Sequence, residues 1–273
     1  MKPIKQILAV IDNSKLSRDI LIKSIEFADK FDAKIIILYT IHIPFFDLPF
    51  YNKNVPIDKE VVKNSINKMF DELNIKKNIN YHTIVYFGDS SDRAVVEAKR
   101  DNIDIVITGA NIKYEKIIRE AKKTLLIIKD RYKEYKNILI PTDLSIKSKD
   151  AIEFMKENFD ANFALVYGYE TIATTMSMYD IGYVDMVEYQ DENREIAQKL
   201  LEEFSMDVGI DGELSDASLS LPYGILDYIE KKAPDLVVTA SHSSPKNFLL
   251  GSISSYIAKE ITTDILIFVR CFT

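Results

Sequence analysis

Two stretches of this chain recur at a fixed offset of 131 residues, and this internal repeat limits the fold more than any other feature. The segment KQILAVIDNSKLSRD, which begins at Lys5, lies over KNILIPTDLSIKSKD, which begins at Lys136. At the same offset, DIVITG from Asp104 lies over DLVVTA from Asp235. A chain of 273 residues has the length of two ordinary domains of about 100 to 150 residues each. We therefore expect two copies of one folding unit, residues 1–132 and 133–273.

Each copy alternates strand and helix patterns. The first apolar runs, Ile7 to Ile11 and Ile138 to Ile140, predict strands that are buried on both faces. Ser14 and Ser145 are the predicted N-caps of the helices that follow. The third strand of the second copy is expected near residues 217–221. The alternation predicts an α/β fold of two tandem doubly wound units, each a parallel sheet with right-handed crossovers and helices on both faces.

Composition and charge exclude several classes of function. One cysteine, Cys271, allows neither an internal disulfide nor a multi-cysteine metal site, and the three histidines lack metal-ligand spacing. The chain shows no secretion signal and no apolar run of the roughly 20 residues that span a bilayer, so we expect a soluble cytoplasmic protein without membrane contact. The net charge of −7 divides into +5 for residues 1–132 and −12 for residues 133–273. Basic residues lie singly on predicted helix faces, which argues against nucleic-acid binding.

The first strands end at aspartates in both copies. In doubly wound sheets, ligands bind beyond the carboxyl ends of the strands, where the strand order reverses. Asp12 and Asp143 are expected at this edge. Each carboxylate could accept hydrogen bonds from ribose hydroxyl groups, or it could cap the turn that follows, and both interpretations carry equal weight.

The loop from Thr239 to Ser255 distinguishes the second copy from the first. It is rich in small residues and runs into a predicted helix, whose unpaired N–H groups and dipole favour an anion. Alignment of the last strands requires an offset of 140 residues, so the second copy has nine extra residues in this loop. The first copy has Gly109 there, without a second glycine or a cluster of hydroxyl groups. We therefore expect the first copy to have lost phosphate binding.

Both copies resemble the universal stress protein family over nearly their whole length. The family's opening Val-Asp-Gly-Ser is similar to the segments Val10 to Ser14 and Pro141 to Ser145. Its closing Asp-Leu-Ile-Val-Met-Gly and Gly-x2-Gly-x9-Gly-Ser/Thr loop are similar at their two ends to Asp235 to Ala240 and Leu249 to Ser252. The resemblance implies an adenine nucleotide α-hydrolase-like fold and units paired through their last strands. It leaves room for a further homodimer.

The resemblance also implies an ATP or AMP site in the second copy, with Mg²⁺ available to offset the acidic charge. Asp143 would hold the ribose, Thr142 and Gly168 would border the adenine, and the residues near Gly251 would hold the phosphates. The candidate nucleotide-binding residues are Pro141, Thr142, Asp143, Gly168, Thr239, Ala240, Ser241, Gly251, Ser252, Ile253 and Ser254. The sequence departs from the family at its first two loop glycines, which are Ala240 and Ser243 here, and Pro245 removes an N–H donor.

These features predict a stress-response regulator that binds an adenine nucleotide and an unknown protein partner, without dedicated catalysis. Two alternatives stay open. One is an interaction module whose variable segments contact a partner through Phe45, Phe46, Phe50, Tyr51, Met176, Met178, Tyr179 and Tyr183. The other is a slow ATPase. The run Ser241-His242-Ser243 places a hydroxyl beside an imidazole, but it lacks a nucleophile elbow, and the chain has no Walker lysine motif.

Overall fold

The computed structural model describes residues 3–41, 58–100, 102–170, 183–217, 220–241 and 251–269. Internal contacts divide the chain into two compact units, Met1–Tyr132 and Lys133–Thr273. The aromatic and methionine residues expected to contact a partner lie outside the described residues, apart from Tyr183, at which a helix begins.

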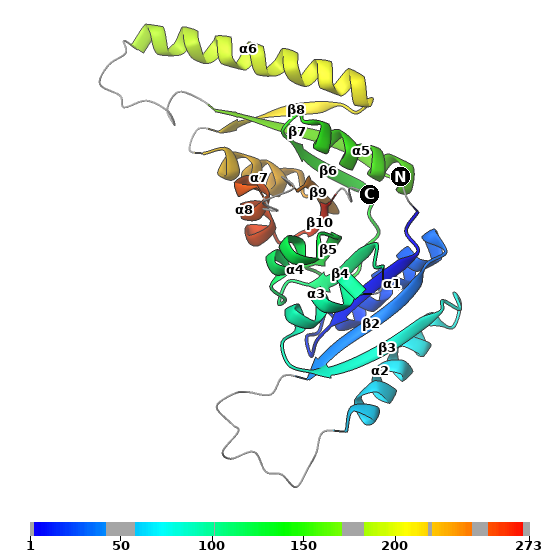
Figure 1. Ribbon diagram of the computed structural model, residues 1–273. Coiled ribbons are helices and arrows are strands. Elements are labelled where there is room, and N and C mark those ends of the chain that lie inside the picture. Colours follow the sequence, from blue (N-terminus) through cyan, green and yellow to red (C-terminus); the bar gives the residue numbers. More distant parts are fainter. Residues whose placement is uncertain are drawn as a thin grey trace, which may run out of the picture. The chain divides into compact units, whose positions relative to one another are not determined.

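The first unit alternates strands and helices along the chain (Figure 1). Its strands are β1 (Gln6–Ile11), β2 (Lys34–Ile41), β3 (Tyr81–Phe87), β4 (Ile105–Gly109) and β5 (Thr124–Ile128). Its helices are α1 (Ser17–Phe31), α2 (Lys59–Asn74), α3 (Ser90–Arg100) and α4 (Tyr114–Ala121). The strands pair in parallel in the order β3-β2-β1-β4-β5. β1 therefore lies between β2 and β4, where the strand order reverses.

The second unit repeats this plan. Its strands are β6 (Asn137–Thr142), β7 (Asn162–Glu170), β8 (Gly212–Ala217), β9 (Leu236–Ala240) and β10 (Asp264–Phe268). Its helices are α5 (Ile146–Asn158), α6 (Tyr183–Val208), α7 (Leu221–Lys232) and α8 (Ser252–Glu260). The strands pair in parallel in the order β8-β7-β6-β9-β10. The predicted α/β class is confirmed, and the expected pairing of the two last strands stays a prediction.

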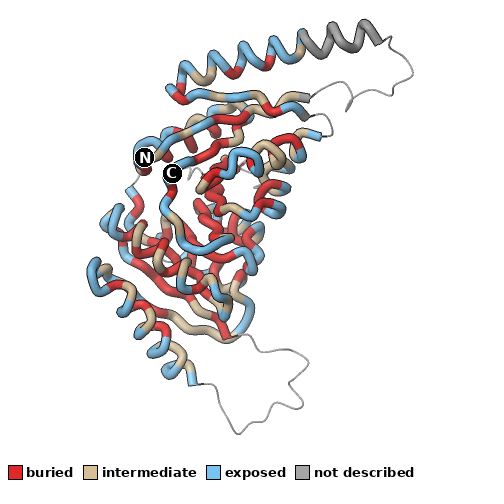
Figure 2. The backbone as a smooth tube through the Cα atoms, turned by 180° about the vertical axis from the view of Figure 1, so that it is seen from behind, coloured by how far each residue is buried: buried red, intermediate tan, exposed pale blue. Residues whose placement is uncertain are grey.

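Helices cover both faces of each sheet, so the central strands are buried on both sides. α1 packs against β1 and α2, whereas α3 packs against β1 and α4. In the second unit α5 contacts α6, and α7 contacts α8. The buried residues follow the strands (Figure 2). From Ile7 to Ile11, β1 is at most 1% exposed, as its continuous apolar run predicts.

A repeated aspartate fastens the central strand of each unit. Asp104 Oδ2 accepts the backbone N–H groups of Lys5 and Gln6 at 2.8 and 3.0 Å, so the start of β4 is tied to the start of β1. Asp235 Oδ2 accepts the two equivalent N–H groups in the second unit, at 3.1 and 2.8 Å. Asp104 and Asp235 therefore have a structural role, because the backbone N–H groups at the start of β1 and β6 need hydrogen-bond acceptors.

Two local predictions are wrong. Ser145 caps α5 as expected and accepts the N–H of Ser148, but α1 begins only at Ser17, and its N-cap is Leu16. The cause is a tighter turn in the first copy, where Ser17 N donates to Ser14 O before the helix begins.

The third strand of the second copy ends at Ala217 instead of beginning there. Its sequence GELSDA is mostly polar, which weakens the strand signal. The apolar residue Leu221 instead opens α7, and Pro222 lies in that helix's first turn, where a missing N–H costs nothing.

α3 begins directly after Asp89, whose carboxylate caps it. Asp89 Oδ1 accepts the N–H groups of Ser91 and Asp92 at 2.9 and 3.0 Å. Burial raises the pKa of Asp89, but these hydrogen bonds and the nearby Lys113 outweigh burial and lower it below 3.8. The ionised carboxylate therefore stabilises the helix start.

Replacement of this cap should remove pH-dependent stability. We expect Asp89→Ala to lower the free energy of unfolding by about 1 kcal/mol near neutral pH. Since the folded-state pKa lies below its ordinary value of 3.8, the ionised form favours folding, and its contribution is lost as the pH falls through the folded-state pKa. Urea unfolding followed by circular dichroism at about pH 6 and about pH 3 should show a smaller wild-type advantage at the lower pH. Asp89→Asn keeps a neutral cap, and a wild-type advantage over it that grows on acidification would contradict the assignment.

α7 packs tightly on β7 at Gly168. A Cβ at this position would lie 2.9 Å from Leu221 Cδ2 and 3.1 Å from Ile225 Cδ1. We expect Gly168→Ala to destabilise the fold by about 1–3 kcal/mol through overpacking, measured as the shift in urea unfolding. Gly109→Ala is the matched control, because its Cβ would meet only Ile20 Cδ1, at 3.4 Å. Equal effects at both positions would contradict this account of the packing.

Candidate nucleotide-binding crevices

A cavity of about 620 Å³ lies at the carboxyl edge of the first unit's sheet. Its walls come from the ends of β1 and β2, from α2, from the start of α3 and from the segment after β4. The lining residues are Asp12, Asn13, Ser14, Tyr39, Thr40, Ile41, Val62, Asp89, Ser90, Ser91, Asn111, Ile112 and Lys113. The volume falls within the range of about 300–1,000 Å³ that is typical of small-molecule sites.

Asp12 organises the turn at the end of β1. Its Oδ1 accepts the N–H of Ser14 at 2.8 Å, and its Oδ2 lies 3.4 Å from Asn111 Nδ2. Burial raises the pKa of Asp12, but hydrogen bonds from Ser14, Asn111 and Ser17 outweigh burial and lower it. The carboxylate is therefore ionised at neutral pH. The interpretation that Asp12 caps its own turn is confirmed. The only hydrogen bond that its Oδ2 accepts from the described residues is the long one from Asn111.

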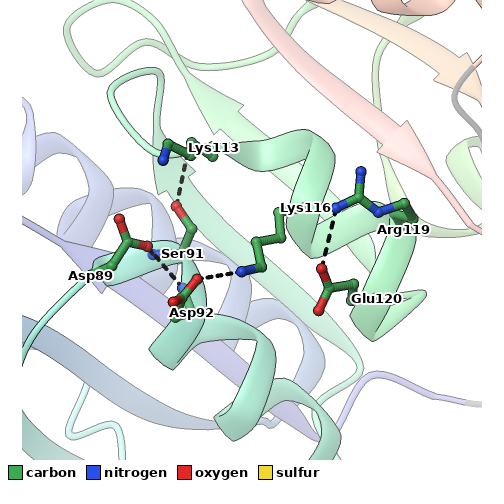
Figure 3. Close-up of polar contacts among 7 residues, drawn as sticks. All are labelled: Asp89, Ser91, Asp92, Lys113, Lys116, Arg119 and Glu120. Atoms are coloured by element: carbon green, nitrogen blue, oxygen red, sulfur yellow. Dashed lines mark hydrogen bonds and ion pairs between the residues drawn. The ribbon is translucent and has the colours of Figure 1, made fainter.

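On one side of this cavity, polar contacts connect α3 with α4 and with the residue before α4 (Figure 3). The backbone N–H of Lys113, which precedes α4, donates to Ser91 Oγ at 3.0 Å. Lys116 Nζ on α4 pairs with Asp92 on α3. These contacts place the Asp89 cap and Lys113 side by side on the cavity wall.

Asp143 occupies the equivalent position in the second unit and is exposed. Its Oδ1 accepts the N–H of Ser145 at 3.0 Å and the hydroxyl of Ser148 at 2.6 Å. Leu144 between them has φ 59°, in the left-handed region that favours glycine, and its N–H donates to Thr142 Oγ1 at 3.0 Å. The glycine of the similar family motif falls at this position. Asp143 also caps its own turn.

A second cavity, of about 60 Å³, lies among the ends of β6 and β9, α7 and α8. Besides Ser148, Ile225 and Ile257, it is lined by the predicted residues Pro141, Thr142, Asp143, Thr239, Ala240, Ile253 and Ser254. The structure thus brings seven of the eleven candidates to one cavity. The other four, Gly168, Ser241, Gly251 and Ser252, do not line it.

The two copies differ in the side chains that pack between the second strand and the helix after the third strand. In the first unit, the hydroxyl groups of Thr40 and Ser90 meet at the cavity wall. Gly168 occupies the position of Thr40 in the second unit, and Leu221 and Ile225 of α7 pack directly over it. Apolar side chains therefore lie in the second unit where the first unit has a polar pair at the wall of its cavity.

Three buried hydroxyl groups of the second unit have no hydrogen-bond partner in the described part of the chain. One belongs to Ser205 on α6, and the other two lie at the end of β9. They belong to Thr239 and Ser241, whose residues are 2% and 4% exposed. In the first unit the counterpart of Thr239, Thr108, donates to Val10 O at 3.4 Å. An unsatisfied buried polar group costs about 1–3 kcal/mol, so a polar ligand atom beside Thr239 would be bound favourably.

The first turn of α8 supplies the candidate anion-binding groups. Gly251 is the N-cap residue, and since it has no side chain, it makes no capping hydrogen bond to the helix N–H groups. Ser252 is the first helical residue. Ser254 reaches the cavity wall. Ala240 ends β9 where the first copy has Gly109, so the first copy keeps the family glycine that the second has lost. His242, Ser243 and Pro245 lie outside the described residues.

Reasoning from the sequence missed the first unit's cavity and the residues that shape it, above all Tyr39, Asp89 and Ser91. The comparison of Thr40 with Gly168 contained a signal, because Thr40 offers a hydroxyl group to the start of α3, whereas Gly168 has no side chain and is covered by Leu221 and Ile225. The expectation that the first copy has lost phosphate binding stays a prediction.

Within the described ranges, no three His, Cys, Asp or Glu side chains are grouped as a metal site would require. No described helix is long and apolar enough to cross a membrane.

Comparisons with known proteins identify the family. The model of the universal stress protein family matches residues 3–129 and again residues 134–270. No curated protein sequence matches the chain. A solved structure of a functionally unknown protein from Pseudomonas aeruginosa PAO1 has a TM-score of 0.67 and 14% identity, over 97% of this chain and 92% of that one. A universal stress protein from Archaeoglobus fulgidus DSM 4304 has a TM-score of 0.62 and 15% identity, over 97% and 96% of the two chains. At these identities the structures show the fold alone, whereas the paired family matches show that this chain belongs to the universal stress protein family and carries two of its repeats.

Proposed function

We propose that this stress-response protein is a regulator whose second unit binds an adenine nucleotide, ATP or AMP. The observation that carries the proposal is convergence at one cavity. Asp143 from the end of β6, the unpaired hydroxyl of Thr239 from β9 and Ser254 from the first turn of α8 all line it. The carboxylate of Asp143 can accept hydrogen bonds from ribose hydroxyl groups. The buried hydroxyl of Thr239 can donate to a polar ligand atom, and the N-terminus of α8 favours a phosphate.

The size of the cavity limits how the nucleotide lies. About 60 Å³ is the space of roughly two water molecules, so the buried part of the site takes one small polar group. Most of the ligand would lie outside it, over the exposed Asp143. Deeper entry would require Leu221 and Ile225 to move away from Gly168.

The negative charge of the second half affects the binding of a negatively charged nucleotide. Residues 133–273 carry a net charge of −12, which disfavours the approach of a bare polyanion. In our proposal Mg²⁺ accompanies ATP and offsets part of this charge. A cytoplasmic location, a protein partner and a homodimer complete the proposal, on the strength of the family alone.

The matched aspartates of the two units provide the test. We expect isothermal titration of the full chain to show ATP binding that Asp143→Asn weakens about tenfold, the cost of about 1.4 kcal/mol for a charge-assisted hydrogen bond. The amide still accepts the N–H of Ser145, so the turn survives. Asp12→Asn is the control and should change the affinity by less than about twofold. A wild-type chain that binds neither ATP nor AMP, or an affinity that falls with Asp12→Asn alone, would refute the proposal.

A further inference from the structure

Helix α6 of the second unit carries exposed aliphatic side chains (Figure 2). Its buried residues Ala197, Leu201 and Val208 share the side of the helix that packs against β7 and β8. Ile196 and Leu200 lie one helical turn apart, outside this buried side, and are 56% and 46% exposed. Two neighbouring aliphatic side chains thus leave apolar surface in contact with water, and a partner that covered them would gain from its burial.

The charges next to this pair are mostly negative. Glu192 lies four residues before Ile196, and Glu203 lies three residues after Leu200, so both are neighbours of the pair on the helix surface. Both glutamates are exposed. Lys199 also lies beside the pair, but Glu203 is its neighbour four residues further on and opposes its charge. The apolar pair therefore has a carboxylate at each end.

The equivalent helix of the first unit lacks this combination. α6 contains eight acidic and two basic residues, whereas α2 contains three of each. Val61, which is 65% exposed, is the one large apolar residue that α2 exposes. Residues 171–182, which precede α6 and lie outside the described part of the chain, contain no lysine or arginine that could offset the charge of α6. The acidic apolar surface is therefore specific to the second copy and does not come from the shared framework.

Lysines of the neighbouring helix α5 contact only the end of α6. Lys149 Nζ pairs with Asp207 at 2.7 Å, and Lys156 Nζ donates to the carbonyl oxygen of Val208 at 2.7 Å. Both contacts lie about two turns beyond Leu200. These lysines are thus already engaged at a distance from the apolar pair, which keeps its acidic surroundings.

We propose that α6 binds a basic amphipathic helix of a partner protein. Its aliphatic side chains would cover Ile196 and Leu200, which form one row of side chains at a spacing of four residues, the arrangement that interdigitates with another helix. Its lysine or arginine side chains would pair with Glu192 and Glu203, so opposite charge sets the orientation of the bound helix. None of the described residues that line the proposed nucleotide cavity belongs to α6, so this surface does not depend on that site.

A synthetic peptide tests this surface on the full-length chain. The probe is a fluorescein-labelled peptide of about 18 residues, or about five helical turns, with leucines along one side and lysines elsewhere. We expect saturable binding in fluorescence anisotropy, which Ile196→Gln combined with Leu200→Gln weakens at least about tenfold. Glutamine is a good helix former, so α6 is retained. Val61→Gln on α2 is the matched control and should change the affinity by less than about twofold.

The charged contacts are tested separately. Glu192→Gln combined with Glu203→Gln should weaken binding at least about threefold and reduce its dependence on salt, because two ion pairs with the peptide are lost. A peptide of the same composition, with its leucines spread around the helix, should bind at least about tenfold more weakly than the amphipathic one.

The proposal is overturned if the amphipathic peptide does not bind, if the peptide with dispersed leucines binds equally well, or if the paired change at Ile196 and Leu200 leaves the affinity within about twofold of the native value. It also fails if that change releases the chain from anionic lipid vesicles, or if it dissolves a homodimer in sedimentation, because a membrane or a second copy would then cover the surface. Titration of ATP into the same variant keeps the two proposals apart, since its affinity for ATP should equal that of the native chain.

Discussion

Each unit depends on a central strand that is paired on both sides. β1 lies between β2 and β4, and β6 lies between β7 and β9. Asp104 and Asp235 fix the start of these strands by accepting the backbone N–H groups of the first strand residue and of the residue before it. This arrangement fixes where the strand order reverses and therefore where the carboxyl ends of the strands leave a crevice. The aspartates at the ends of β1 and β6 reach that crevice because the apolar runs before them, Ile7 to Ile11 and Ile138 to Ile140, are buried and cannot slip in register without exposing apolar side chains.

The two crevices show how one framework gives two different sites. In the first unit, Thr40 and the start of α3 meet through polar side chains, and a cavity remains. In the second, the absence of a side chain at Gly168 lets Leu221 and Ile225 fill the same place. A strand position without a side chain can thus be covered by apolar side chains of a helix, because protein interiors are packed about as densely as organic crystals. The cavity that remains is small, with a buried hydroxyl at its wall.

The charged groups beside each crevice differ from the net charge of the half that carries it. The first half has a net charge of +5, yet the described residues that line its cavity include two carboxylates and a single lysine. The second half has a net charge of −12, yet α8 presents an N-terminus without a side-chain cap and with serines in its first turn. Charges on exposed helix faces are screened within about 10 Å at moderate salt, whereas groups at the wall of a cavity act on a ligand directly. The net charge of a half therefore does not predict the charge of the groups beside its crevice.

The sequence alone determined the duplication, the α/β class and the position of Asp12 and Asp143 at strand ends, because these follow from short-range patterns that repeat at one offset. It also indicated seven residues that line one cavity of the second unit. It placed the start of α1 and the third strand of the second copy incorrectly, where a tight turn and a polar strand gave weak local signals. Only the tertiary structure decided which crevice is open. That outcome depends on side chains far apart in sequence, such as Gly168 with Leu221 and Thr40 with Ser90, and no local pattern records whether such a pair packs together or leaves a space.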